Sequence, residues 1–269
     1  TVTLSQAEDF RMESEVLHGL LELLDDADFE RPTLFKDWTI NDILRHLHHG
    51  NILADLSLND EVAFHETYAE IKALRDGGMD FPEATAQVLD GVGGKDLLAT
   101  WREFYGAMSG RFAEADPKKR VKWVGPDMSV RSSITARLME TWSHGQAAFD
   151  LFGVERQDTD RIKNVAVLGM NTFGWTFVNR GEEVPSPAPY VRLNAPSGVV
   201  WEWHEPSDEQ RIEGSAVEFC QVVTQTRNIG DTALYVAGDV ANQWMSVAQC
   251  FAGPPRTPPA TGTRRKSGA

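Results

Sequence analysis

The sequence predicts an α+β protein, in which an up-down helical bundle of four main helices is followed by a small α+β domain. Three observations support this fold class. Four long segments in the first part of the chain repeat apolar residues at helical spacing. Three prolines then fall within residues 185–189 and stop any helix there. Two short segments rich in β-branched and aromatic residues follow these prolines and are typical of strands.

Composition excludes several classes of protein. The chain has 269 residues, of which 41% are hydrophobic, as in a packed globular protein. It carries 40 acidic against 26 basic residues, a formal net charge of -14, so it would repel nucleic acid. No apolar run is long enough for a membrane span or a secretory signal. The chain has only two cysteines, Cys220 and Cys250, which are too few for a disulfide framework. We therefore expect a protein of the reducing cytoplasm.

The first two helices have clear signals. Residues 4–28 place leucines and phenylalanine among acids at helical spacing, and this helix should end before the Arg31-Pro32 turn. Thr39 and Asp42 match a capping box, which predicts a second helix over residues 40–58.

The later helices vary in strength. Residues 60–93 predict short helices with mobile links, because Gly77-Gly78 and the glycines at 91, 93 and 94 interrupt them. Residues 96–115 and 132–151 predict two long helices, with a connecting loop over 117–128. A further helix is expected over 161–178, with two glycines inside it.

The second domain should contain strands at 190–193 and 199–203 and helices near 215–226 and 240–251. We therefore expect a bundle domain over 1–183 and a small α+β domain over 184–252. Residues 253–269 are rich in Pro and Gly, with four basic residues and no acid, and predict a disordered tail.

Three histidines, His46, His48 and His49, lie within four positions of the second predicted helix. At about 100° per residue, His46 and His48 lie at opposite edges of the apolar stripe of this helix, and His49 lies on the face away from the stripe. Periodicity alone does not choose between His46 and His48.

Glu140 and His144 lie one helical turn apart on a later helix, on a face bracketed by small or apolar residues. Two interpretations are open. The pair could be a local hydrogen-bonded pair, with the histidine cluster a surface coincidence. Alternatively, the pair and one histidine of the second helix form a site of two histidines and one carboxylate, which leaves coordination positions free for water or substrate.

Two motifs resemble a known family. Residues 38–47, WTINDILRHL, are similar to the W-[ST]-x-x-D-[IV]-[ILV]-x-H-L motif of the DinB-like superfamily, in its mycothiol-dependent maleylpyruvate isomerase branch. Residues 119–129, KRVKWVGPDMS, and 135–146, TARLMETWSHGQ, resemble signatures of an actinobacterial subgroup of that branch. The resemblance covers most of the chain and is weakest over residues 60–93.

The resemblance implies residue roles. It places the metal ligands on His46, Glu140 and His144, and leaves His48 and His49 as expected solvated helix residues, although His48 could carry protons. A C-terminal module of the family resembles residues 211–244, and its active-site arginine matches Arg227. A basic residue at the end of a helix is an equally good reading of Arg227.

The expected function is a metal-dependent enzyme that uses mycothiol as cosubstrate, for S-transfer to a small electrophile or for its thiol-assisted isomerisation. Zinc is the expected ion, with iron, nickel or manganese as alternatives. The partners would be small molecules only, and the chain a monomer or homodimer. The alternatives are a thiol-independent isomerase, lyase, hydrolase or oxygenase with the same ligands, or a non-catalytic binding protein.

Overall fold

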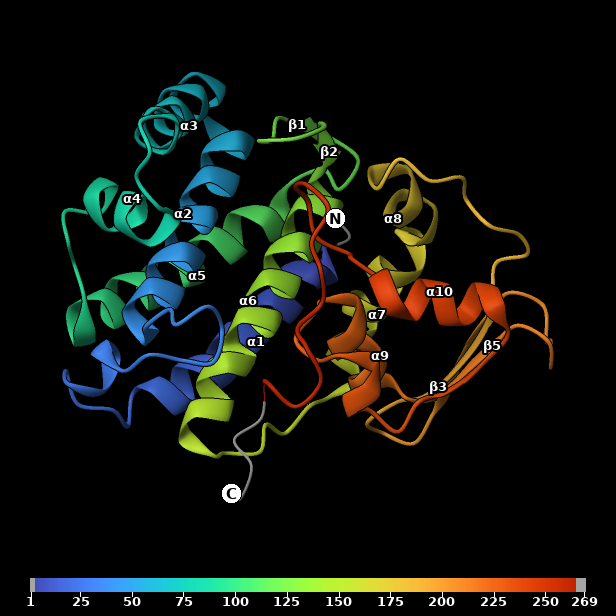
Figure 1. Cartoon of the computed structure of the whole chain (residues 1–269). Coiled ribbons are helices and arrows are strands. Elements are labelled where there is room, and N and C mark those ends of the chain that lie inside the picture. The colour runs from blue at the N-terminus through green and yellow to red at the C-terminus, as the bar shows by residue number, and fades with distance from the viewer. Residues whose placement is uncertain (1–2, 265–269) are drawn as a thin grey trace. The chain divides into compact units, whose positions relative to one another are not determined.

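The computed structural model describes residues 3–264 and divides into two compact units, the first ending at Leu151 and the second beginning at Phe152. The fold is mixed α+β and mainly helical, as predicted (Figure 1). Among the described residues, no helix combines the length and apolar character that crossing a membrane requires.

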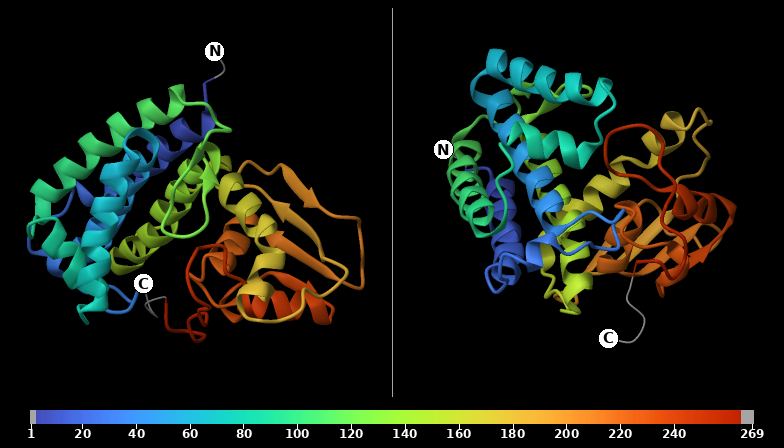
Figure 2. Two further views of the ribbon diagram at one scale, coloured as in Figure 1. Left: turned by 90° about the horizontal axis from the view of Figure 1, so that it is seen from above. Right: turned by 60° about the vertical axis from the view of Figure 1, so that its left-hand side comes forward.

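The first unit is a bundle of four long helices. Helix α5 contacts both α1 and α2, and side chains of α2 contact α6, so the four lie side by side (Figure 2). Their interior is filled by large, fully buried side chains, Trp101 and Trp142 among them. The helices of this unit are α1 (Ser5–Leu21), α2 (Ile40–Asn59), α3 (Glu61–Asp76), α4 (Phe81–Val88), α5 (Gly94–Glu114) and α6 (Val130–Phe152), with a 3-10 turn, η1 (Asp28–Glu30).

Helix α2 begins where the capping box predicts. Thr39 Oγ1 accepts from the Asp42 backbone N–H at 3.1 Å, and the Asp42 carboxylate accepts from the Thr39 N–H at 2.9 Å. The first helix is shorter than predicted, ending at Leu21 instead of residue 28. The predicted loop over 117–128 includes strand β1 (Arg120–Val121), which pairs antiparallel with β2 (Met128–Ser129).

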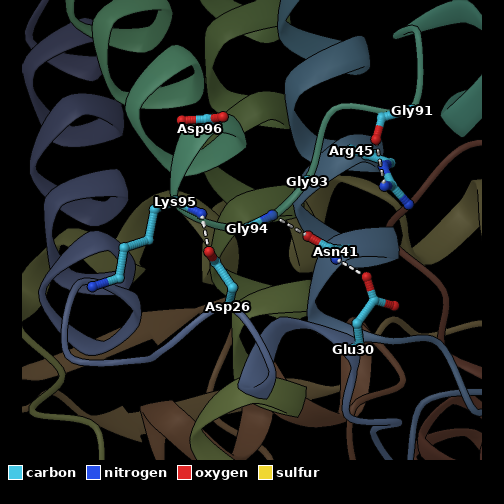
Figure 3. Close-up of a pocket in the computed structure, with 9 residues that line it drawn as sticks. All are labelled: Asp26, Glu30, Asn41, Arg45, Gly91, Gly93, Gly94, Lys95 and Asp96. Atoms are coloured by element: carbon cyan, nitrogen blue, oxygen red, sulfur yellow. Dashed lines mark hydrogen bonds between the residues drawn. The ribbon is translucent and has the colours of Figure 1, made fainter.

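The glycine link before α5 is held in place, contrary to the mobile link expected (Figure 3). Asn41 of α2 is buried, donates to Glu30 Oε1 at 2.7 Å and accepts from the Gly94 N–H at 2.8 Å. The Lys95 N–H donates to Asp26 at 3.0 Å. Gly94 has φ of +60°, and a side chain there would also overlap the Asp26 carboxylate, so this close turn requires glycine.

The second unit is a four-stranded sheet covered by helices. Its strand order is β4-β3-β5-β6, with β3 and β5 parallel and the other pairs antiparallel. Helix α9 packs on β3 and β5, and α10 contacts β6 and α8. The elements are β3 (Tyr190–Asn194), β4 (Val200–Trp203), β5 (Arg211–Ser215), β6 (Tyr235–Ala237), α7 (Lys163–Asn171), α8 (Phe173–Asn179), α9 (Ala216–Val223) and α10 (Asp239–Val247), with 3-10 turns η2 (Asp160–Ile162) and η3 (Ile229–Asp231).

The break between the compact units comes at residue 151, not at the predicted boundary after residue 183. Residues 161–178, predicted as one helix of the bundle, form η2, α7 and α8, and α7 packs on α9. At Gly169 an added Cβ would lie 2.9 Å from Val223 Cγ2, so the missing side chain permits this close helix contact. The prolines interrupt the chain within the second unit.

The tail over 253–269 was expected to be disordered, and this is wrong for residues 253–264. They form no helix or strand, but their backbone is hydrogen-bonded to the second unit. The Arg256 N–H donates to Gln249 at 2.8 Å, Asn228 donates to the Pro259 carbonyl at 2.9 Å, and the Gly262 N–H donates to Asp231 at 3.0 Å. Residues 265–269 of this predicted tail lie outside the described residues.

Candidate metal centre

Helices α2 and α6 run antiparallel and bring the candidate ligands together. His46 of α2 meets Glu140 of α6, and five residues later Asn51 meets Arg137, which precedes Glu140. His144 lies one turn after Glu140 on the same face of α6. The local Glu140–His144 pair therefore exists, and a histidine from another helix joins it.

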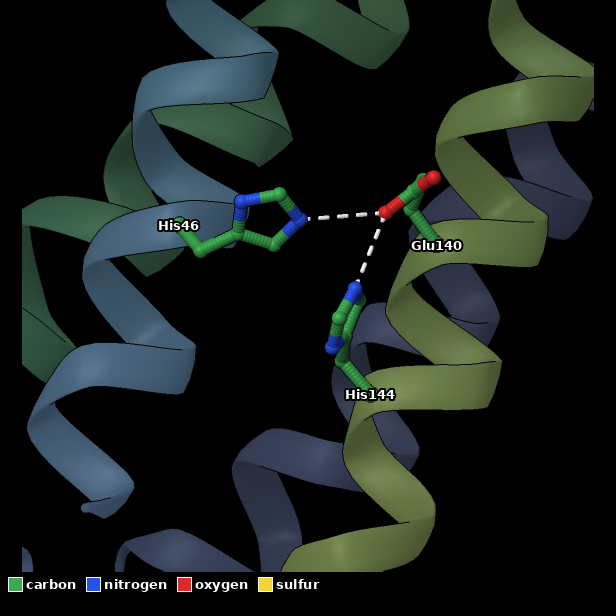
Figure 4. Close-up of side chains that lie close together, drawn as sticks. All are labelled: His46, Glu140 and His144. Atoms are coloured by element: carbon green, nitrogen blue, oxygen red, sulfur yellow. Dashed lines mark hydrogen bonds and ion pairs between the residues drawn. The ribbon is translucent and has the colours of Figure 1, made fainter. Parts of the chain in front are cut away.

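The three side chains converge on one carboxylate oxygen (Figure 4). Nε2 of His46 and Nε2 of His144 each lie 3.1 Å from Oε2 of Glu140. The two imidazole ring centres are 4.4 Å apart. Each side chain keeps between 16% and 20% of its surface exposed, so the cluster is partly open to solvent.

The protonation states suit cation binding. Burial raises the pKa of Glu140, but hydrogen bonds from His144 and His46 outweigh it and hold this pKa well below its usual value. Burial, together with the charge of His144, lowers the pKa of His46 to about 4. At neutral pH the carboxylate is charged and the His46 imidazole is neutral, which are the forms that bind metals.

The donor set fits a small divalent ion. The candidate donor atoms all lie within 4.8 Å of one another. Ligands about 2 Å from zinc at tetrahedral angles are separated by about 3.3 Å, close to the measured 3.1 Å. Three protein ligands would leave at least one coordination position open, as in catalytic zinc sites.

Aromatic rings surround the two histidines. Trp38 is parallel to the His144 ring, with centres 6.0 Å apart, and its centre lies 5.6 Å from that of His46. Phe35 meets His144 edge to face at 5.1 Å, and Phe81 meets His46 at 5.3 Å. These contacts restrict the imidazole rings and give the cluster an apolar wall.

The wall depends on the local backbone around Trp38. A tight loop presents Phe35 and Trp38, closed by hydrogen bonds from the Thr33 N–H to the Trp38 carbonyl at 2.8 Å and from the Trp38 N–H to Phe35 at 2.9 Å. Lys36 and Asp37 at its tip have φ of 52° and 58°, which is uncommon for residues with a side chain. Phe81 is the first residue of α4, which is capped by Asp80.

His48 and His49 are not solvated, contrary to expectation. Each is only 4% exposed, and burial lowers the pKa of both to about 4. The His48 ring packs edge to face on Phe104 of α5, with centres 5.3 Å apart. Neither belongs to the group that could hold a metal ion, so of the three clustered histidines only His46 joins Glu140 and His144.

Arg227 lies in the second unit, four residues after the last residue of α9. It is 3% exposed, its Nη1 donates to the Thr226 carbonyl at 3.0 Å, and its backbone N–H donates to the Gln221 carbonyl at 3.2 Å. These hydrogen bonds are consistent with the interpretation of Arg227 as a basic residue placed at the C-terminal end of a helix. Its catalytic role stays a prediction.

Sequence reasoning overlooked several of the residues that frame the cluster. Phe35 and Phe81 were not singled out, because a loop and a short helix carry them and periodicity does not apply there. Arg137 was also missed, although its place one turn before Glu140 could have indicated it. It is buried on the side of α6 that meets α2.

The family model described as the mycothiol maleylpyruvate isomerase N-terminal domain matches residues 10–149 of the chain. The chain belongs to this family. The matched range contains all three candidate ligands and nearly the whole first unit. It therefore agrees with the DinB-like resemblance of the motifs.

Relatives and solved structures extend the comparison. Two uncharacterized proteins of Mycobacterium tuberculosis, one from strain CDC 1551 / Oshkosh and one from strain H37Rv, are each 35% identical over 247 residues, covering 92% of this chain and 95% of theirs. The crystal structure of the mycothiol-dependent maleylpyruvate isomerase covers 81% of this chain and 87% of its own, with a TM-score of 0.50 and 14% identity. A histidine-to-alanine mutant of that enzyme matches with the same TM-score and 16% identity. At this identity the structures show the shared fold.

Proposed function

We propose that the chain is a metal-dependent enzyme that uses a low-molecular-weight thiol, mycothiol, to isomerise a small unsaturated electrophile or to join the intact thiol to it through sulfur. The observation that carries the proposal is the convergence of His46, Glu140 and His144 on one oxygen position, within the unit that matches the mycothiol isomerase family. Mycothiol dependence is named for the family and for a solved structure of the same fold.

His46, Glu140 and His144 would hold the metal. When bound, such an ion lowers the pKa of a coordinated thiol and so makes a thiolate available near neutral pH. Glu140 supplies the one anionic ligand, and the aromatic rings of Trp38 and Phe81 keep the imidazoles oriented. The three side chains are partly exposed, as access of a thiol and an electrophile to the cluster would require.

The cysteines of the chain give no alternative source of thiolate. Cys220 and Cys250 both lie in the second unit and both are buried. Burial raises the pKa of the Cys220 thiol well above its usual value, so this sulfur stays protonated at neutral pH. We therefore expect a thiolate reaction of this protein to use a thiol cosubstrate.

We further propose that Arg227 steadies an anionic group of the substrate during turnover. The support is its match to the arginine of the family's C-terminal module and the permanent charge of a guanidinium. An Arg227→Lys variant keeps the charge and loses the planar fork of donors. We expect it to raise KM for an anionic substrate while its metal content stays that of the wild type.

Metal content is the first test. Purified wild type should carry close to one equivalent of zinc or a similar ion, and His144→Ala should lose most of it. His65→Ala is the matched control, because His65 pairs with Glu61 on α3 at the same helical spacing, at 3.6 Å. Both are exposed, and within residues 3–264 no third ligand joins them. Equal metal content in the wild type and His144→Ala would contradict the site.

Mycothiol binding and turnover are the second test. Calorimetry should detect mycothiol binding to the metal-loaded protein and much weaker binding after chelation of the metal. Isomerisation of maleylpyruvate, as the first substrate to assay, should require both metal and thiol. Turnover that continues without any thiol would instead support a thiol-independent metal enzyme.

A further inference from the structure

In the part of the chain that the structure describes, a buried guanidinium lies beside the candidate metal centre and pairs with no carboxylate. Arg137 is 4% exposed, and its Nε donates to Oδ1 of Asn51 at 3.2 Å. Among the described residues its Nη2 has no hydrogen-bond partner and the side chain forms no ion pair. A buried charge with only a neutral amide beside it is costly, by several kcal/mol in typical cases. Such a cost is seldom retained without a role.

The packing of α2 and α6 puts this cation in place. A Cβ on Gly50 would overlap the Arg137 guanidinium, so the side chain lies against bare backbone of α2. Gly50 comes one turn after His46, and Arg137 comes one turn before Glu140. The guanidinium therefore lies in the same interface between α2 and α6 as the candidate ligands, one helical turn away from them.

The candidate ligand group itself contains a single charged side chain. Glu140 is the only acidic residue in the candidate ligand group, and both of its partners there are imidazoles. Burial lowers the pKa of Arg137, and the Glu140 charge opposes part of this lowering, so the two groups interact electrostatically. With a divalent ion, two neutral imidazoles and one carboxylate, a site has a net charge of +1. A guanidinium one turn away raises this to +2.

We infer that Arg137 is a positioning residue that favours anion binding at the metal. Its fixed positive charge offsets the negative charge of Glu140, so a divalent ion in the site keeps its full attraction for an anionic ligand. This inference rests on the proposed function, in which a thiolate binds at the metal. Arg137 touches neither reacting group and acts through the electric field. Its effect has opposite signs for the two ligands, since it weakens the binding of the metal and strengthens that of the anion.

The experiment compares Arg137→Met with the wild type, using Co²⁺ and thiocyanate as probes. Thiocyanate is a permanent monoanion, so its binding includes no loss of a proton, and its contact with cobalt changes the visible spectrum. At an effective dielectric constant of about 20 and a separation on the order of 10 Å, one unit charge changes the affinity for a monoanion by about tenfold, and that for a divalent ion by more. Arg137→Met should bind Co²⁺ at least about tenfold more tightly and, once loaded, bind thiocyanate about tenfold more weakly.

Structural damage would not produce this result, because it would weaken both affinities together. Arg137→Lys keeps the charge and should stay within about threefold of the wild type for both probes. Arg137→Gln also removes the charge but keeps an amide donor for Asn51, so it repeats the test if the Met variant folds poorly. Lys72→Met, which removes an exposed charge paired with Asp76 on α3, controls for the net charge of the protein and should change neither affinity.

The outcomes separate this inference from the proposed function. Opposite shifts in Arg137→Met, with no mycothiol binding by the wild type, would support the role of Arg137 and reject the thiol chemistry. Parallel losses in the Met and Gln variants, or no change in either affinity, would overturn the inference even if the wild type turns over mycothiol. The same shifts in Lys72→Met would also overturn it.

Discussion

The buried histidines of α2 should make the fold sensitive to mild acid. His48 is 4% exposed, and burial lowers its pKa from 6.5 to about 4. Well above pH 6.5, as at pH 7.5, the imidazole is neutral in both the folded and the unfolded chain, so it has almost no effect on stability. As the pH falls from 6.5 towards 4, the unfolded chain takes up a proton that the folded chain does not bind, so stability is lost across this window.

The size of the loss follows from these two pKa values. At pH 5, a histidine with a pKa of 6.5 when unfolded and about 4 when folded lowers the free energy of unfolding by about 2 kcal/mol relative to pH 7.5. Replacing it by leucine, which does not titrate and suits the contact with Phe104, should remove this loss. His48→Leu should therefore lose about 2 kcal/mol less than the wild type between pH 7.5 and pH 5.

Urea unfolding followed by circular dichroism at the two pH values gives the necessary differences in free energy. His65→Leu is the control, because His65 is exposed on α3 and is not subject to this burial. It should lose as much stability as the wild type. If wild type and His48→Leu lose equal stability between pH 7.5 and pH 5, the burial argument is wrong.

Three further outcomes can be measured on the same protein. A metal ion at 100 times its Kd should raise the free energy of unfolding by about 2.7 kcal/mol. Thermal unfolding with and without zinc should show this stabilisation in the wild type but not in Glu140→Gln. Trp38→Leu should weaken zinc binding by about tenfold in a chelator competition, because the ring contacts the two imidazoles, and an unchanged Kd would exclude that orienting effect. Gly169→Ala should destabilise the second unit by about 1–3 kcal/mol in urea, and Val223→Ala in the same chain should recover part of the loss, since a Cβ would lie 2.9 Å from Val223.

The sequence was sufficient for the elements with strong local signals. The capping box at Thr39 marks the start of α2, and helical spacing marks α5 and α6, because these signals depend on neighbouring residues alone. The choice between His46 and His48 was beyond periodicity. His46 meets α6, whereas His48 packs on Phe104 of α5. Both histidines flank the apolar stripe, and only the identity of the helix packed on each side distinguishes them.

The errors have a common physical origin in contacts between distant residues. The prolines after residue 183 were read as the domain boundary, but α7 belongs with the second unit because Gly169 lets it approach α9. The composition of residues 253–264 suggested disorder, but side chains such as Gln249 and Asn228 satisfy their backbone. Neither effect is visible in a local window of sequence, because in both the partner lies elsewhere in the chain.

The charge of the candidate site argues for a particular class of metal ion. The chain has 40 acidic residues, yet the ligand group contains only one, and the buried cation Arg137 lies one turn from it. Affinity for a cation in such a site has to come from the two imidazole nitrogens, since the local charge is nearly balanced before the ion binds. Magnesium and calcium prefer oxygen ligands, whereas zinc, cobalt and iron accept imidazole. Zinc or cobalt should therefore raise the unfolding temperature of the wild type, and magnesium at the same concentration should not. A rise with magnesium that survives in Glu140→Gln would place its binding on the acidic surface instead of in this site.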